Sequence, residues 1–324
     1  MVKSKILITG GLGFIGSNLA IKLVENGNEV TLVDSLIPEY GGNKRNINGI
    51  ENLVQVNLSD VRDPFSINEL VKKQDFLFNL AGQTSHLDSM ENPFIDLDIN
   101  SKAQLSILEA CRLNNPNIRI VFASTRQIYG RPQYLPVDEK HPLHPVDING
   151  INKMAGEKYH LLYNEIYGIR SSVLRLTNTY GPRMRIKDAR QTFLGVWIRN
   201  LLLGESIQVF GDGKQRRDYN YIDDVIDALI IAASEESAVG EIYNLGAPNP
   251  LTLEETAKIM TAQTNGGCYE MVAFPKDRKA IDIGDFICDY KNFQSSFGWE
   301  PKVGFTKGIS FSIDYFQKEI DYYL

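Results

Sequence analysis

The first half of the chain alternates short apolar runs with longer segments whose apolar residues recur at helical spacing. Residues 5–9 (KILIT) form a continuous apolar run, and residues 14–26 then place apolar side chains three and four positions apart. Further strand-like runs cover 29–33, 53–56, 76–80, 118–123 and, after a predicted helix over 151–167, 171–176. Apolar strands separated by helices are typical of a parallel sheet covered on both faces. The pattern predicts a doubly wound α/β domain.

The pattern changes after Tyr180. Two loops rich in glycine and arginine, GPRMR and FGDGKQRRDYNY, separate predicted helices over 193–203 and 225–233. Predicted helices over 253–262 and 309–318 follow, with a short strand near Tyr243. We therefore expect a sheet domain over 1–176, to which a segment at about 220–250 returns. A smaller, mixed α/β lobe is expected over 177–324.

Composition and charge exclude several classes of protein. The 324 residues carry 34 Lys and Arg against 40 Asp and Glu, a net charge of −6 with no long basic run. We therefore expect neither nucleic acid nor a membrane as a partner. The N-terminus lacks the pattern of a signal peptide. The three cysteines are not spaced as metal ligands, so we expect a cytoplasmic protein without a metal site.

A glycine-rich loop, TGGLGFIGSNLA, follows the first predicted strand. Gly10 would permit a tight turn, Gly13 would let the backbone approach a pyrophosphate, and Gly16 would let helix and strand pack closely. The helix start at Phe14 and Ile15 would offer N–H groups and a partial positive charge to the phosphates. Turns need glycine for conformational reasons alone, so this loop becomes informative only with its context.

Residues after the later strands suit the same ligand. Asp34 ends the second strand, 18 positions after the last glycine of the loop, near the spacing at which an acid binds a ribose 2′-hydroxyl. Because an acid there would repel a 2′-phosphate, NAD is favoured over NADP. Asp60 and Val61 follow the third strand and suit the adenine edge, and Ala81 and Gly82 follow the fourth and suit close passage of the cofactor.

Segments spread over nearly the whole chain resemble the extended short-chain dehydrogenase/reductase family, in particular its NAD-dependent nucleotide-sugar epimerases and dehydratases. They are TGGLGFIG, Asp34, NLAG, FASTRQIYG, GINKMAGEKY, RLTNTYGPR and FGDGKQRRDYNYIDD. The resemblance implies a Rossmann domain, NAD, a nucleotide-diphosphate sugar as substrate, and a homodimer formed through the helices at 101–113 and 151–167. It also implies hydride transfer from a sugar carbon, assisted by a Ser or Thr and a Tyr-x-x-x-Lys pair.

The chain departs from this pattern at one catalytic position. The lysine of the pair corresponds to Lys153, which would lower the pKa of the tyrosine and hold the nicotinamide ribose, but Asn149 stands where the tyrosine should be. A carboxamide does not titrate near neutral pH, so Asn149 can orient a hydroxyl or a water but cannot take its proton. Three explanations are open: a locally different helix register, another group as base, or a protein with little turnover.

Several groups are candidates for the missing base. His86 follows the fourth strand at the expected mouth of the site and is of a residue type suited to proton transfer, although a surface-loop role is equally open. Tyr129 suits packing better, and Tyr159 lies six helical positions from Lys153, on another face. Lys153 could act only if burial depressed its pKa. Thr125 aligns with the family Ser or Thr and would hydrogen-bond the reacting sugar oxygen.

The two positions after that threonine distinguish between reactions. The 4,6-dehydratases carry Asp-Glu here, an acid and a base for the elimination of water, whereas this chain has Arg126 and Gln127. Neither is a general acid or base at neutral pH, so dehydration is disfavoured. The sugar-nucleotide decarboxylases usually keep a glutamate near this position, so Gln127 also counts against decarboxylation, although NTYGPRM looks much like their sequence.

The resemblance places the sugar nucleotide beside polar residues of the second half. Asn178 corresponds to an asparagine that contacts the diphosphate, with a turn-forming role as the alternative. Arg217 corresponds to an arginine whose guanidinium fork grips the diphosphate. Arg185 and Gln191 are expected to line the same pocket, and Arg278 is expected as a second cation, although DIGD stands where many relatives have RPGD.

We therefore expect an NAD-dependent 4-epimerase of a UDP-hexose that works through a 4-keto intermediate. Lys153 would hold the nicotinamide ribose, Thr125 would bind the 4-hydroxyl, and a group other than Asn149 would take its proton. Two alternatives are open. The first is a nucleotide-sugar dehydrogenase, decarboxylase or atypical dehydratase, and the second is a weakly catalytic or non-catalytic NAD-binding protein.

Overall fold

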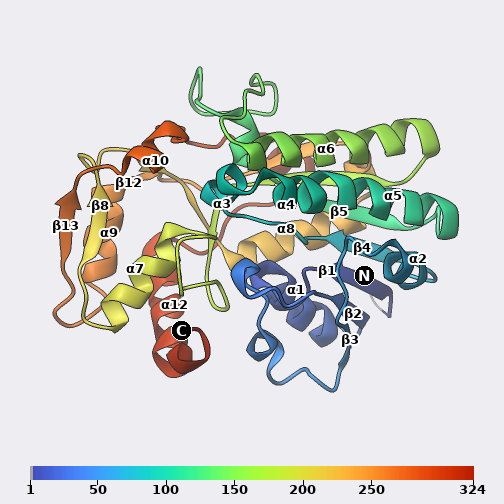
Figure 1. Cartoon of the computed structure of the whole chain (residues 1–324), viewed down its shortest axis with the longest axis horizontal. Helices are drawn as coiled ribbons and strands as arrows, with labels where there is room; N and C mark the ends of the chain where they lie inside the picture. The colour runs from blue at the N-terminus through green and yellow to red at the C-terminus, as the bar shows by residue number, and fades with distance from the viewer. Residues whose placement is uncertain (1–2) are drawn as a thin grey trace.

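A parallel sheet of seven strands forms the centre of the molecule (Figure 1). The computed structural model describes residues 3–324. The strands are ordered β11-β6-β5-β4-β1-β2-β3, and each neighbouring pair is parallel. Their bounds are β1 Lys5–Thr9, β2 Glu29–Val33, β3 Val54–Asn57, β4 Phe76–Asn79, β5 Arg119–Thr125, β6 Ser171–Leu176 and β11 Ile242–Leu245. The predicted doubly wound α/β fold is confirmed.

Helices cover both faces of this sheet because both faces of its strands are apolar. Within β1, Ile6 and Ile8 belong to a buried cluster on one face and Leu7 to a cluster on the other. The first face is covered by α1 (Phe14–Glu25) and α8 (Ile222–Ser234), which pack together. The second face is covered by α2 (Pro64–Leu70), α5 (Ala103–Asn114) and α6 (Ile148–Tyr167), of which α5 and α6 run side by side in Figure 1.

A smaller lobe of helices and two-stranded sheets lies beside the central sheet, at the left in Figure 1. Its paired strands are β7 (Asn178–Tyr180) with β10 (Tyr219–Tyr221), β9 (Arg216–Arg217) with β12 (Leu251–Thr252), and β8 (Ile207–Phe210) with β13 (Tyr269–Val272). Its helices are α7 (Phe193–Leu202), α9 (Leu253–Thr261), α10 (Lys276–Ala280) and α12 (Phe305–Glu319). The chain returns to the central sheet between these elements, through α8 and β11. The predicted boundary after residue 176 stays a prediction.

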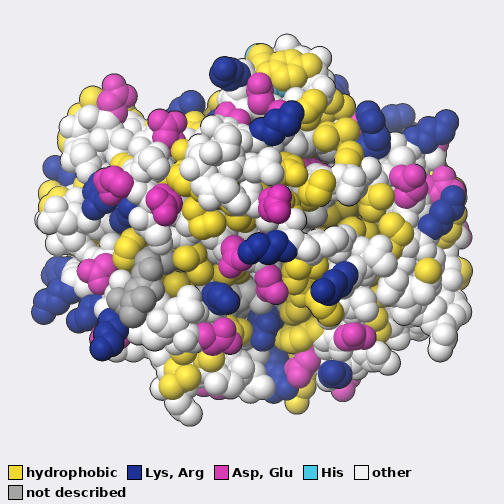
Figure 2. All heavy atoms as spheres, turned by 180° about the vertical axis from the view of Figure 1, so that it is seen from behind, with side chains coloured by type: hydrophobic (Ala, Val, Ile, Leu, Met, Phe, Trp, Pro, Cys, Tyr) yellow, Lys and Arg dark blue, Asp and Glu magenta, His cyan; other side chains and the backbone are white. Residues whose placement is uncertain are grey.

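Three short helices complete the fold. α3 (His86–Glu91) and α4 (Pro93–Leu97) connect β4 to α5, and α11 (Lys291–Phe297) packs against β11. Among the helices of residues 3–324, none combines the length and the apolar character needed to span a membrane. On the face shown in Figure 2, basic and acidic side chains are interspersed and do not gather by sign.

The carboxyl ends of the parallel strands share one edge of the sheet. Both β2 and β4 pair with β1, so the order of the strands along the chain reverses at this point. Open α/β sheets bind ligands outside the carboxyl ends of their strands at such a reversal. Gly10, Asp34, Leu80 and Thr125 stand at or just after the ends of β1, β2, β4 and β5, and they define where the site is to be sought.

Candidate functional site

The glycine-rich loop forms the tight turn that its sequence predicts. Gly10 has a φ of +68°, in the left-handed region, and its carbonyl accepts a hydrogen bond from the Gly13 N–H at 3.1 Å. A Cβ at Gly16 would overlap that same carbonyl oxygen, so only glycine lets α1 approach the loop. Gly13 caps the N-terminus of α1 without a side chain, which leaves the backbone N–H groups of the first turn available to phosphates.

A cavity of about 120 Å³ opens at this helix N-terminus. The structure brings ten of the predicted cofactor-binding residues to its walls: Gly10, Gly13, Phe14, Ile15, Gly16, Asp34, Asp60, Val61, Ala81 and Gly82. The eleventh, Lys153, lines a larger cavity next to it. The two cavities share walls at Phe14, Ile15, Leu80, Gly82, Thr84 and Gln191, so they form one continuous cleft.

Two acids of the smaller cavity are held in place by local hydrogen bonds. The Asp34 carboxylate accepts the backbone N–H groups of Leu12 at 3.0 Å and Leu36 at 2.9 Å, and burial raises its pKa. The Asp60 carboxylate accepts Arg62 Nε at 2.9 Å and Nη2 at 2.6 Å, and this pairing lowers its pKa. Asp34 ends β2, where an acid would meet the adenosine ribose of a dinucleotide.

Lys153 stands where the two cavities meet. Its Nζ donates to the Ala123 carbonyl at 3.2 Å, and a Cβ at Gly82 would lie 2.9 Å from Nζ and 2.9 Å from Asn100 Oδ1. Glycine at position 82 therefore leaves room for the ammonium group beside the amide oxygen. Burial lowers the pKa of Lys153 to about 8, and Asp96 partly opposes this shift. The group is charged at neutral pH and directed at the junction.

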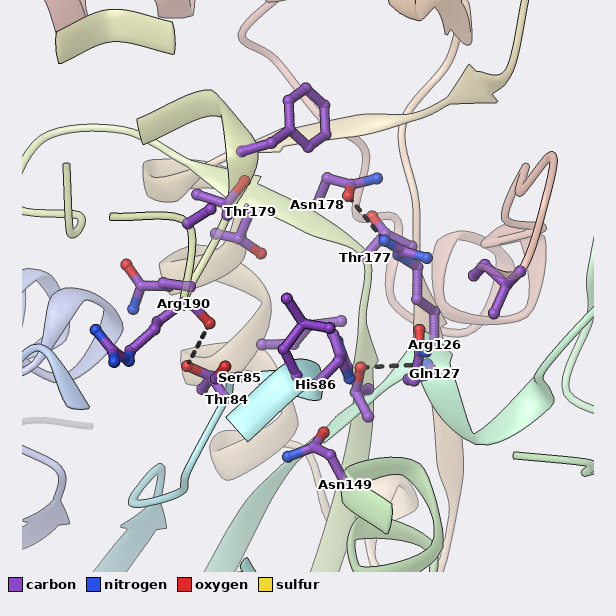
Figure 3. Close-up of a pocket in the computed structure, with 18 of the residues that line it drawn as sticks. Thr84, Ser85, His86, Arg126, Gln127, Asn149, Thr177, Asn178, Thr179 and Arg190 are labelled. Atoms are coloured by element: carbon purple, nitrogen blue, oxygen red, sulfur yellow. Dashed lines mark hydrogen bonds between the residues drawn. The ribbon is translucent and has the colours of Figure 1, made fainter. Parts of the chain in front are cut away.

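The larger cavity has a volume of about 730 Å³ and lies between the sheet edge and the smaller lobe. Its walls include the four predicted catalytic residues, Thr125, Lys153, Asn149 and His86, together with Asn178, Gln191, Arg217 and Arg278. Figure 3 shows several of these side chains, with His86 between Asn149 and the Thr177–Thr179 segment. Residues that are far apart in sequence are thus brought together as predicted.

Arg185 is the exception, and its predicted place on this wall is wrong. Its Nε donates to Asp188 at 2.7 Å and its Nη1 donates to the Pro38 carbonyl at 2.6 Å, so the guanidinium lies behind Asp188, which lines the cavity, and does not line it itself. The cation that does line the wall is Arg190, which pairs with Asp88 at 2.6 Å and Asp188 at 2.7 Å. The sequence offered no signal for choosing between the two, since both flank the same aspartate.

Asn149 takes part in a buried polar cluster. Its Nδ2 donates to Asp96 Oδ2 at 2.9 Å and to the Gln83 carbonyl at 2.8 Å. Asp96 is fully buried and also accepts Asn100 at 3.0 Å and Asn152 at 2.8 Å, so three amides satisfy one carboxylate. A buried carboxylate without such donors would be strongly unfavourable. The amide at position 149 thus has a structural partner that accounts for its presence.

The helix register at this position is regular. Helix α6 is continuous from Ile148 to Tyr167, and Asn149 and Lys153 both line the larger cavity, as positions i and i+4 of one face should. A local shift of register therefore does not explain the missing tyrosine. No tyrosine lines the larger cavity within residues 3–324. Of the three explanations for the missing tyrosine, two are left: another group acts as the base, or the protein turns over little substrate.

His86 lies against a buried aspartate. Its Nδ1 is 3.1 Å from Asp147 Oδ2, an ion-pair distance, although the ring nitrogen has no aligned hydrogen-bond partner within residues 3–324. The ring is 37% exposed and lines the cavity, whereas the Asp147 side chain has no exposed surface. The two groups have the arrangement of a histidine base with an orienting carboxylate.

Asp147 is tied to two further elements of the site. Its Oδ1 accepts the Gly150 N–H at 2.7 Å, which caps α6, and its Oδ2 accepts Gln127 Nε2 at 2.6 Å. Burial raises its pKa, but His86, Gly150 and Gln127 outweigh burial and lower it overall. Asp147 was not among the predicted site residues, because the helix was predicted to begin at 151, three positions after its true start at Ile148, and its N-cap was therefore not recognised.

The two tyrosine candidates, and the buried histidine of α6, lie outside the cavity. Tyr129 is fully buried, donates to Asn244 Oδ1 at 2.7 Å and accepts from Arg175 Nη1 at 2.6 Å, and burial raises its pKa. Tyr159 packs at the edge of the second core cluster. His160 is stacked on Phe122. The structure leaves His86 and Lys153 as the nitrogen bases on the cavity wall.

The predicted substrate residues lie at the lobe side of the cavity. Asn178 Nδ2 donates to the Asp218 carbonyl at 2.9 Å and its Oδ1 accepts Arg126 Nη2 at 3.0 Å. Arg217 lies 3.6 Å from Asp282 and also donates to the Gly284 carbonyl, so the DIGD segment contacts it directly. These contacts fix an amide and a guanidinium within the cavity, where an anionic ligand could be bound.

Comparison with known proteins agrees with this geometry. Residues 6–246 match the model of the NAD dependent epimerase/dehydratase family. A "Putative UDP-glucose 4-epimerase" of Methanocaldococcus jannaschii is 36% identical over 94% of this chain and 95% of its own length. UDP-glucuronic acid decarboxylase 1 of Xenopus tropicalis is 31% identical over 99% of this chain and 74% of its own. The structure of UDP-glucose 4-epimerase from Thermotoga maritima with UDP-glucose has a TM-score of 0.88 at 30% identity, over 98% and 99% of the two chains.

Proposed function

The chain belongs to the NAD dependent epimerase/dehydratase family, and from that premise we propose that it is a nucleotide-sugar 4-epimerase of the UDP-hexose type. The observation that carries the proposal is the junction of the two cavities. Lys153 and Thr125 both line the larger cavity beside that junction, while Arg126 and Gln127 occupy the two positions that hold an acid and a base in the dehydratases. A site that can remove and return hydrogen at one carbon, but lacks a pair for eliminating water, fits epimerisation.

NAD is the cofactor on which this family depends, and the residues around the smaller cavity suit its adenosine and pyrophosphate. The N-terminus of α1 would bind the pyrophosphate, Asp34 the hydroxyls of the adenosine ribose, and Lys153 the nicotinamide ribose. Bound there, NAD would supply a hydride acceptor for carbon 4 of the hexose and, once reduced, a hydride donor for the return step. The chain's own residues must therefore hold the hexose and move one proton.

We assign the proton to His86. Thr125 Oγ1 accepts the Gln127 N–H at 3.2 Å, which fixes the hydroxyl at the end of β5 where it can donate to the 4-oxygen of the sugar. His86 Nε2 would take the proton of the 4-hydroxyl as the C4–H bond breaks, and Asp147 would stabilise the imidazolium that results. The keto-sugar turns in the cavity, and on reduction His86 returns the proton to the 4-oxygen.

Product analysis separates this proposal from its alternatives. The NAD-loaded protein is incubated with UDP-glucose, UDP-N-acetylglucosamine and UDP-glucuronate, and the products are identified by NMR. A 4-epimer with the carbon skeleton intact is the expected product. Release of carbon dioxide would instead indicate the decarboxylase activity of the Xenopus tropicalis relative, and a released keto-sugar would indicate a dehydrogenase or dehydratase.

A non-catalytic NAD-binding protein is the second alternative, and Asn149 is the observation behind it. If no substrate turns over, Asn149→Tyr tests this alternative, because a tyrosine there would restore the Tyr-x-x-x-Lys pair. Activity gained from a silent parent would support the non-catalytic role. If the parent is active and Asn149→Tyr has the same rate, the working base lies elsewhere, as proposed for His86.

A cytoplasmic homodimer is part of the same proposal. Helices α5 and α6 lie side by side, with their inner faces in the core and large apolar side chains exposed on the outside. The exposed residues are Leu105, Leu113, Ile151, Leu162, Ile166 and Tyr167. An apolar face of this kind favours association with a second copy. Sedimentation velocity would show a species of twice the chain mass.

A further inference from the structure

Arg126 lines the larger cavity with one hydrogen-bond partner and no carboxylate at ion-pair distance among residues 3–324. It follows Thr125 directly at the end of β5 and lines the cavity, and Figure 3 shows it reaching toward Asn178. Its Nη2 donates to Asn178 Oδ1 at 3.0 Å. Its Nη1 is buried and has no hydrogen-bond partner within residues 3–324. The Phe286 ring lies beside the guanidinium, 5.4 Å from its central carbon.

The charged groups around Arg126 do not neutralise it by contact. Asp218 and Asp282 favour its charge from beyond ion-pair distance, and Arg217 opposes it. Burial, and then Arg217, lower its pKa to about 10, so it is charged at neutral pH. Asp218 has an unpartnered oxygen of its own but does not line the cavity. A partly buried guanidinium without a paired anion is unfavourable, and a ligand anion removes that penalty.

Other cations are available for the diphosphate. Arg217 and Arg278 both line the lobe side of the cavity, and together they match the two charges of a diphosphate. Arg190 already has two carboxylate partners, Asp88 and Asp188. Arg126 differs from these cations because its backbone is next to Thr125, the residue assigned to the reacting hydroxyl. Its backbone follows that threonine and its guanidinium contacts Asn178, so a substituent of a hexose bound between the two is within its reach.

We propose that Arg126 binds a carboxylate carried by the hexose, which makes a nucleotide-linked hexuronate the preferred substrate class. The inference rests on the proposed function and deepens it by naming that class. A guanidinium binds a carboxylate through two parallel N–H···O bonds, and its free Nη1 supplies a donor for this purpose.

The proposal also accounts for the fate of the intermediate. Oxidation at carbon 4 of a hexuronate gives a β-keto acid, which loses carbon dioxide when its carboxylate electrons can move into the ring. A charged guanidinium that grips the carboxylate holds those electrons on its oxygens. The position that would protonate carbon 5 is Gln127, whose amide donates to Asp147 at 2.6 Å and is not an acid. The site therefore favours return of hydrogen to carbon 4 over loss of carbon dioxide.

Calorimetric titration of the NAD-loaded protein with UDP, UDP-glucose and UDP-glucuronate tests the proposal by affinity, a readout separate from the rate of epimerisation. The parent protein should bind UDP-glucuronate at least about tenfold more tightly than UDP-glucose. Arg126→Gln should abolish that preference and leave the affinity for UDP within about twofold. Arg170→Gln is the matched control, since Arg170 lies at the opposite end of the strands, just before β6, and should change none of the three affinities.

Two results would overturn the inference. One is equal affinity of the parent for UDP-glucose and UDP-glucuronate. The other is an equal loss for all three ligands in Arg126→Gln, which would assign Arg126 to the diphosphate. If Arg126→Gln does not fold, Arg126→Lys carries the test, because it keeps the charge but loses the fork and should reduce the preference severalfold. Failure of epimerisation with retained hexuronate preference would overturn the proposed function and leave this inference standing.

Discussion

The two cavities of the cleft differ in which parts of the chain form their walls. The smaller cavity is formed by backbone, glycines and short-range hydrogen bonds at the ends of β1, β2 and β4, and each of its predicted residues lies where the sequence pattern indicates. The larger cavity is formed by side chains from β5, α3, α6 and the lobe, and several of them differ from the family pattern. The cofactor end is thus set by the fold, whereas the reaction is set by a few side chains.

The largest effect is expected from disturbing the cofactor end. Gly16→Val places a side chain on the Gly10 carbonyl, so the loop must move and NAD binding should fall below detection. Overpacking of this kind also destabilises the fold, by about 3 kcal/mol. NAD content after purification and the thermal unfolding midpoint measure the two effects. Gly304→Ala is the control for NAD content, which should be unchanged because a Cβ there meets nothing within 4 Å; as Gly304 is the N-cap of α12, the midpoint should fall only slightly.

At the sugar end the largest effect is expected at His86. His86→Gln should lower kcat by about 10² to 10⁴, the range that general acid–base catalysis supplies. Steady-state kinetics measure this loss, and calorimetry should show that the affinities for NAD and UDP are unchanged, because the residue is assigned only to the proton. His144→Gln replaces an exposed histidine outside both cavities and should keep full activity. Parent-like activity in His86→Gln would rule out His86 as the base.

The lysine at the junction gives a stability effect of intermediate size. Its pKa is about 8 in the folded chain and about 10.4 when unfolded, so between these values the unfolded state binds more protons. The free energy of unfolding contributed by Lys153 should therefore rise with pH across this window, by on the order of 3 kcal/mol.

Urea unfolding of the NAD-free protein at a series of pH values checks this, with Lys153→Met as the comparison. Subtracting the Lys153→Met curve from the parent curve should isolate the rise. Lys102→Met replaces an exposed lysine and should leave the pH dependence as in the parent. A Lys153→Met protein with the same pH dependence as the parent would show that the ammonium is not destabilised by burial.

The smallest effect on activity is expected at the outer face of α5 and α6. Ile166→Glu puts a charge among exposed apolar side chains and should shift the protein from dimer to monomer, with a rate per chain within about twofold of the parent. Sedimentation velocity measures the change. Leu53→Glu, at another exposed apolar position, is the control and should remain dimeric. A monomeric parent would contradict the proposed dimer.

The difference between the two cavities also explains how far the sequence could be interpreted. The strands and the glycine loop follow from local patterns, so Gly10, Gly16 and Asp34 could be placed without a structure. Arg185 was misplaced because its local pairing with Asp188 leaves no trace in the sequence. The partnership of Asp147 with His86 joins positions 61 residues apart and depends on how α3 and α6 pack.

Substituted positions were the hardest to interpret. Asn149 could be recognised as a departure, but its partner Asp96 could not be predicted, because three asparagines converge on that carboxylate only in the folded chain. In the sequence, Arg126 was informative only because it stands where the 4,6-dehydratases carry an acid. The structure adds that its Nη1 is buried and has no hydrogen-bond partner within residues 3–324. That free donor is the reason for asking whether the hexose carries a negative charge.

The central claim is that hydrogen leaves and returns to carbon 4 within the protein, with His86 handling only the hydroxyl proton. It is tested most directly by running the reaction in D₂O with UDP-glucuronate and UDP-glucose and following carbon 4 by NMR. The account predicts a 4-epimer whose carbon 4 carries no solvent deuterium, because the hydride is held on the cofactor throughout. Deuterium at carbon 4 would contradict it. So would a failure to form a 4-epimer from both substrates.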